Sequence, residues 1–75
     1  MEKYKNLGGD SGVTTYEIGE DSIKVEFSDG ALYLYNYHSA GSHNIEKMKG
    51  LAIAGEGLNS YINKNARKGY AEKLR

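Results

Sequence analysis

The stretch Phe27-Ser28-Asp29-Gly30-Ala31-Leu32-Tyr33-Leu34-Tyr35 decides how the rest of the chain can fold. An Asp-Gly pair between two alternating segments is a strong signal for a β-hairpin. Residues 22–28, ahead of the turn, alternate apolar and charged side chains, which is the period of a strand with one buried face. The sequence therefore predicts two antiparallel strands that meet at this turn.

The length of the hairpin loop leaves two registers open. A two-residue loop at Asp29-Gly30 pairs Val25 with Leu34 and turns Tyr33 and Tyr35 away from the face of Val25. A three-residue loop, with the glycine in the left-handed conformation, pairs Val25 with Tyr33 and places both tyrosines on the core face. A slip of one residue swaps every side chain between faces, so both arrangements stay open. The alternation of the residues favours the two-residue loop, because that loop groups the aliphatic side chains.

The remaining elements follow from hydrophobic periodicity. Residues 13–18 are rich in β-branched and aromatic side chains, and they complete a three-stranded antiparallel meander over residues 13–37. Apolar residues then recur at helical spacing over 43–54 and 58–67, which predicts two helices packed on one face of the sheet. This is an α+β fold. Residues 1–12 contain three glycines, so we expect a flexible N-terminal tail before a single domain at 13–75.

Composition limits the classes of protein. Seventy-five residues without cysteine form one domain with no disulfide and no thiolate metal site. No apolar run approaches the roughly 20 residues of a membrane span, so we expect a cytoplasmic protein that does not enter membranes. The net charge is zero, but residues 1–42 carry −4 and residues 43–75 carry +4. The two halves can neutralise each other, or the basic half can meet an acidic partner.

Several short motifs resemble the KTSC domain, a small bacterial module that also occurs at the C-terminus of some lysyl-tRNA synthetases. The motifs are Val25-x-Phe27-x-Asp29-Gly30, Tyr33-x-Tyr35, Ala54-x-x-Gly57 and Asn63. The chain lacks the proline that the family usually has soon after the second tyrosine, so the resemblance is to a divergent member. It implies that Tyr33 and Tyr35 lie on the packed face. The family has no established activity, although RNA binding has been suggested for it.

Two groups of residues could contact a ligand. Tyr33, Tyr35 and Tyr37 could form a platform on which single-stranded bases stack, or they could be core aromatics with polar edges. A second group shares one face of the second predicted helix and could bind phosphates, or could be an ordinary solvated face. That group consists of Lys64, Arg67 and Lys68.

If the tyrosines are buried, Leu32 and Leu34 must lie on the outer face of the sheet, where they could mediate self-association. No nucleophile motif, metal-ligand spacing or cofactor motif is present, so we expect no enzyme activity and no cofactor. The sequence therefore predicts a small non-catalytic binding or interaction module that forms a homodimer or binds a protein partner. The alternative is a module that binds RNA or another single-stranded nucleic acid.

Overall fold

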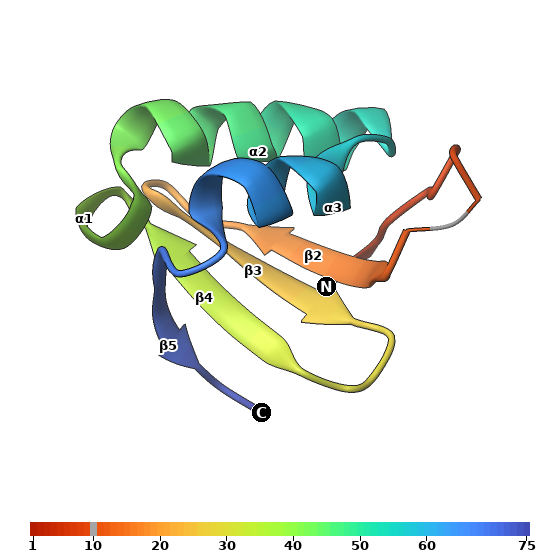
Figure 1. Ribbon diagram of the computed structural model, residues 1–75, viewed down its shortest axis with the longest axis horizontal. Helices are drawn as coiled ribbons and strands as arrows, with labels where there is room; N and C mark the ends of the chain where they lie inside the picture. The colour runs from red at the N-terminus through yellow and green to blue at the C-terminus, as the bar shows by residue number, and fades with distance from the viewer. Residues whose placement is uncertain (10) are drawn as a thin grey trace.

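A computed structural model describes residues 1–9 and 11–75 of the protein. It shows an antiparallel sheet in which the strands lie side by side in chain order, with helices against one face (Figure 1). The strands are β1 (Glu2–Lys3), β2 (Val13–Ile18), β3 (Ser22–Phe27), β4 (Leu32–Asn36) and β5 (Tyr70–Lys73). The helices are α1 (Tyr37–Ala40), α2 (Ser42–Ala54) and α3 (Leu58–Tyr61), which continues as the π-helical segment η1 (Ile62–Ala66).

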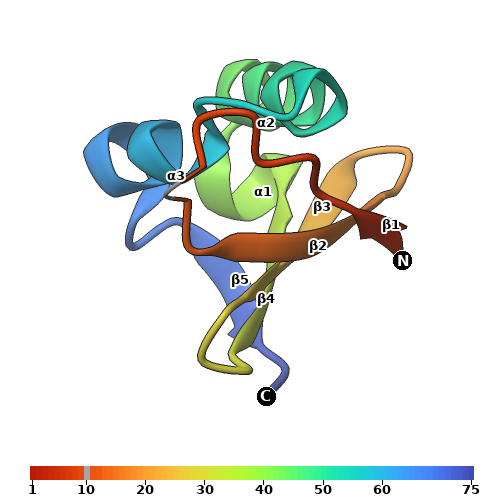
Figure 2. The ribbon, with the colours of Figure 1, turned by 90° about the vertical axis from the view of Figure 1, so that its right-hand side faces the viewer.

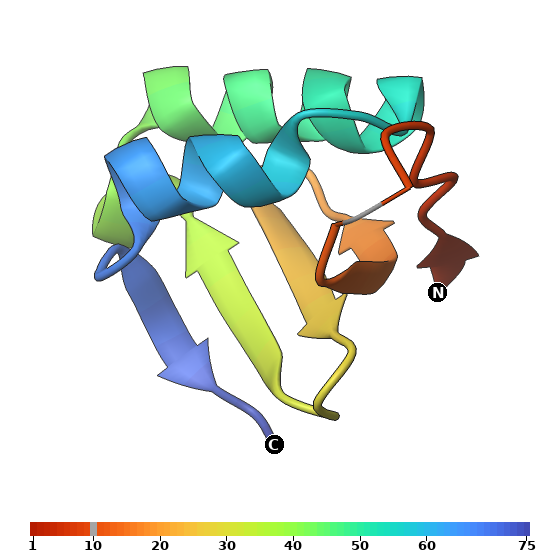
Figure 3. The same ribbon diagram turned by 45° about the vertical axis from the view of Figure 1, so that its right-hand side comes forward.

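The α+β class and the antiparallel meander are confirmed, but the prediction of three strands was wrong. The sheet has five strands, because β1 joins the open edge of β2 and β5 joins the open edge of β4 (Figure 3). Both added strands are short and exposed, so they lack the alternation of buried residues that identifies a strand in a sequence. Their backbone pairing, rather than their side chains, makes them part of the sheet.

The hairpin has the three-residue loop. Val25 pairs with Tyr33, the Phe27 amide donates to the Ala31 carbonyl over 2.8 Å, and Gly30 has a φ of +90°. The glycine is needed there because side chains rarely adopt that backbone conformation. Tyr35 is consequently buried in the core and Tyr33 is half-buried on the same face.

The N-terminal segment is part of the folded domain, although it was expected to be a flexible tail. The Tyr4 amide donates to the Thr14 carbonyl over 2.9 Å, and the Tyr4 ring is only 2% exposed. Its hydroxyl accepts a hydrogen bond from the Leu58 amide at 3.2 Å. One buried aromatic ring and these hydrogen bonds offset the entropy of ordering the glycine-rich segment. Asp10, within the expected tail, lies outside the described residues.

The helices α2 and α3 lie side by side over the sheet (Figure 2). They agree closely with the helices predicted over 43–54 and 58–67. Between β4 and α2, α1 adds one turn, and its first amides are capped by reciprocal hydrogen bonds between Asn36 and Ser39. The core is built from both layers: Tyr4, Val13, Tyr16, Ile23, Val25, Tyr35, Ile45, Met48, Ala52, Leu58, Ile62 and Ala66.

Candidate binding groove

A groove of about 400 Å³ lies between the helix-facing side of β3, β4 and β5 and the segment α3–η1. Figure 3 shows the arrangement of these elements, with α3–η1 above β4 and β5. Its volume is within the range of sites that hold small ligands. Its lining combines aromatic, amide and charged side chains: Phe27, Asp29, Tyr33, Tyr35, Asn59, Ile62, Asn63, Arg67 and Tyr70, with Gly12, Ser28 and Ala31.

Aromatic rings from three adjacent strands form one wall of the groove, with Tyr33 at their centre. The centroid of the Tyr33 ring is 4.9 Å from that of Tyr70 and 5.7 Å from that of Phe27, and the Phe27 contact is edge to face. The Tyr35 ring follows at 6.4 Å. This wall arises because the hairpin register and the pairing of β5 turn these rings to the same side of the sheet.

Polar side chains from the helix face this wall. Asn59 lies in α3, Asn63 in η1 and Arg67 directly after η1. Because they are spaced four residues apart, they follow one side of this segment, and all three line the groove. Within residues 1–9 and 11–75, the side chains of these three residues form no hydrogen bond or ion pair. Two amides and a guanidinium therefore have their hydrogen-bonding groups available to a ligand.

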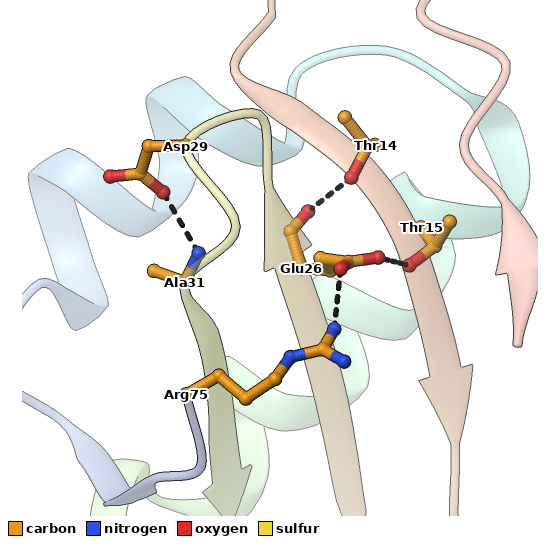
Figure 4. Close-up of polar contacts among 6 residues, drawn as sticks. All are labelled: Thr14, Thr15, Glu26, Asp29, Ala31 and Arg75. Carbon is orange, nitrogen blue, oxygen red and sulfur yellow. Dashed lines mark hydrogen bonds and ion pairs between the residues drawn. The ribbon is translucent and has the colours of Figure 1, made fainter.

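Charged groups of both signs lie at the groove. Arg67 lines it, and the Lys73 ammonium lies 5.8 Å from the centroid of the Tyr33 ring. The lining also contains Asp29, but its carboxylate accepts a hydrogen bond from the Ala31 amide over 3.0 Å within its own turn (Figure 4). The site thus joins ring faces with cations, an arrangement that favours ligands having both a planar ring and a negative charge.

The Tyr35 hydroxyl is neutral at physiological pH. Burial, aided by the nearby Tyr33 and Tyr70 hydroxyls, raises the pKa of Tyr35 to about 12. Within the described residues it has no hydrogen-bond partner, and its side chain lines the groove. It can therefore donate to or accept from a bound group without acquiring a charge.

The structure brings together only some of the predicted site residues: Tyr33, Tyr35 and Arg67 share the groove, whereas Lys64 and Lys68 do not line it. Tyr37 lies elsewhere on α1, where its hydroxyl donates to Glu46 over 2.6 Å and Lys49 lies over its ring at 5.8 Å. This hydrogen bond raises the pKa of Tyr37, and together with Lys49 it lowers that of Glu46. Tyr37 is thus engaged in a separate surface network.

The other side chains that line the groove were not predicted as site residues, among them Phe27, Asn59, Asn63 and Tyr70. Their spacing already placed the two asparagines together, but only the pairing of β5 with β4 places Tyr70 beside Tyr33.

The outer face of the sheet carries Leu32 and Leu34, as the three-residue loop requires. Both leucines are half-buried and lie opposite charged residues: Leu32 pairs with Glu26, and Leu34 with Lys24 and Glu72. They do not form the bare apolar patch on which the prediction of self-association rests.

Residues 1–9 and 11–75 contain neither a metal-ligand cluster nor a helix that could span a membrane. No three histidine, aspartate or glutamate side chains gather so as to hold a metal ion. Within the same residues, every helix is too short or too polar to cross a bilayer.

Comparison with known proteins gave no relative: no family model, no curated protein and no solved structure matches the chain. The resemblance to the KTSC domain therefore stays a prediction.

Proposed function

We propose that the protein is a non-catalytic binding module that takes a planar group of its partner into the groove, and that this partner is a single-stranded nucleic acid such as RNA. One observation carries the proposal: Arg67 lies in the same groove as Tyr33 and Tyr70. A nucleotide presents a flat base next to a phosphate, which are the two features that an aromatic wall and a guanidinium recognise together. The function suggested for the KTSC domain is consistent with this proposal.

The free amides of the helix support the same partner. Asn59 and Asn63 offer paired donors and acceptors at the side of the groove opposite the rings. A base that stacks on the wall would present its polar edge to groups of this kind. A cytoplasmic location, expected from the sequence, would give the module access to RNA.

The charge distribution limits the expected strength of binding. The whole chain is neutral, and its first 42 residues carry −4, so few phosphates can be contacted at once. We therefore expect weak binding with a shallow dependence on salt, because the slope follows the number of phosphates contacted. A homodimer or protein partner through Leu32 and Leu34 is the less favoured function, because these side chains are half-buried among charged neighbours.

An NMR titration of the labelled protein with a short single-stranded RNA, at low and moderate salt, tests the proposal. We expect shifts of the Asn63 and Asn59 side-chain amides and of backbone signals around Arg67 and Tyr70, with smaller shifts at higher salt. Signals of Leu34 on the outer face serve as an internal control and should stay in place. A flat titration at low salt would remove nucleic acid from consideration and leave a protein partner as the function to pursue.

A further inference from the structure

One side of the groove is formed by Tyr70 of β5, a short strand at the edge of the sheet. All four residues of β5 are exposed, and its pairing with β4 is interrupted by an irregularity between Leu34 and Tyr35. Short, exposed strands at a sheet edge open with a low free-energy cost. Yet β5 supplies Tyr70 and the ammonium of Lys73, the two groups that lie against Tyr33.

An ion pair on the opposite face of the sheet reaches this strand. The Arg75 guanidinium contacts the Glu26 carboxylate of β3 (Figure 4). The preceding residue is also held, because the Leu74 amide donates to the Leu32 carbonyl over 2.6 Å. Because β4 lies between β3 and β5, the Arg75 side chain crosses β4 at the level of Leu32, the residue that pairs with Glu26. The ion pair therefore connects the end of β5 to β3, although β5 is not paired with β3 in the sheet.

The carboxylate is held in place before Arg75 reaches it. The Thr15 hydroxyl of β2 donates to Glu26 over 2.7 Å, and the Glu26 side chain is 26% exposed, compared with 57% for Arg75. A carboxylate that is already oriented loses less entropy on forming an ion pair than two free surface side chains do. Glu26 thus connects β2, β3 and the end of β5.

We infer that Glu26 and Arg75 are positioning residues of the groove: their ion pair on the outer face holds β5 against β4 and so keeps Tyr70 and Lys73 beside Tyr33 on the inner face. The proposed function, on which this rests, concerns the groove alone. The ion pair adds a way for the outer face of the sheet to control the position of the β5 wall of the groove. Neither residue lines the groove.

Amide hydrogen exchange measured by NMR tests the inference in the full chain. Glu26→Gln keeps the shape of the side chain and an oxygen for Thr15 but removes the charge that Arg75 contacts. An exposed ion pair stabilises only modestly, so we expect the Leu74 amide to exchange about two- to five-fold faster. The Val25 amide, in the centre of the sheet, should not change, which would show that the whole domain is as stable as before.

Glu17→Gln is the matched control. Glu17 forms the other ion pair of the outer face, with Lys24 at 3.6 Å, and it has no contact with β5. Exchange at Leu74 should be the same in this variant as in the wild type. Unchanged exchange at Leu74 in Glu26→Gln, or an equal increase in both variants, would overturn the inference.

Addition of the RNA probe separates this inference from the proposed function. A ligand that uses the β5 wall must slow the exchange of Leu74 in the wild type, because binding favours the closed strand. Groove shifts without slower exchange at Leu74 would show that β5 is not a wall of the binding site, and would overturn the inference. If the wild type shows no groove shifts, the proposed function fails, and the comparison of Glu26→Gln with Glu17→Gln still decides whether the ion pair holds β5.

Discussion

Val25 lies directly opposite Tyr33 in the β3–β4 ladder, and this pairing decides the chemistry of both faces of the sheet. It sends Tyr33 and Tyr35 toward the helices, where they meet Tyr70 and Arg67. It sends Leu32 and Leu34 outward, among charged side chains. A register shifted by one residue would exchange the two sets and remove the groove.

Arg67→Gln should weaken RNA binding and reduce the dependence of log affinity on log salt by about one phosphate contact, because it removes the cation that lines the groove. Lys68→Gln is the matched control. It removes the same charge from the neighbouring residue, whose side chain does not line the groove. Titrations at several salt concentrations measure both slopes. Equal losses in the two variants would show that the attraction is diffuse rather than located at the groove.

Tyr70→Ala should cost about 1–3 kcal/mol of binding free energy, the usual contribution of one aromatic ring that stacks on a base. Tyr37→Ala is the control, because Tyr37 is similarly exposed, at 39% against 43%, but lies away from the groove. Calorimetric or fluorescence titrations compare the two variants. A larger effect of Tyr37→Ala would indicate that the RNA binds at α1 and not in the groove.

Tyr35 should make the protein less stable in alkali. In the unfolded chain a tyrosine loses its proton near pH 10, whereas Tyr35 in the folded protein keeps it to about pH 12. The folded state binds the proton more tightly, so the contribution of Tyr35 to stability is complete below pH 10 and is lost as the pH rises toward 12. Urea unfolding at pH 8 and pH 11 should therefore show a smaller loss in Tyr35→Phe than in the wild type. The same loss in both proteins would contradict the role of Tyr35.

Tyr4→Phe should destabilise the domain by about 1 kcal/mol, because it removes the acceptor of the Leu58 amide in a buried position. Tyr37→Phe, which removes an exposed hydroxyl that donates to Glu46, should have a smaller effect. Chemical unfolding measures both changes. If Tyr4→Phe has no effect, the N-terminal segment does not contribute to the fold through this hydrogen bond.

Sedimentation of the wild type should show a monomer at high concentration, because Leu32 and Leu34 are half-buried among charged neighbours. Leu34→Glu should then sediment like the wild type. A wild-type dimer that Leu34→Glu converts to monomer would contradict this and would support the self-association predicted from the sequence.

The parts of the fold that bury apolar side chains at a regular period were predictable. Ile23 and Val25 identify β3, and Ile45, Met48 and Ala52 identify α2, since each set repeats at the period of its element. The strands β1 and β5 were not predictable, because they join the sheet through backbone pairing and bury little. The register required the loop length, which Asp29-Gly30 allows in two forms.

The binding site was predictable only within single elements. Tyr33 could be selected as an aromatic residue in a predicted strand, and Arg67 as a basic residue in a predicted helix. Their proximity depends on how α3–η1 packs over the sheet, and the position of Tyr70 depends on a strand that was missed. Contacts between residues far apart in the chain leave no periodic signal in one sequence.

The order of the strands has a consequence for how the molecule folds. Strands β2, β3 and β4 are joined by short turns, whereas residues 37–69 separate β4 from β5. Closing so long a loop carries a larger entropic cost than closing a hairpin, and contacts distant in sequence form slowly. We therefore expect the central hairpins and α2 to assemble before β5 docks, so that the protein completes its core first and acquires its groove in the last step.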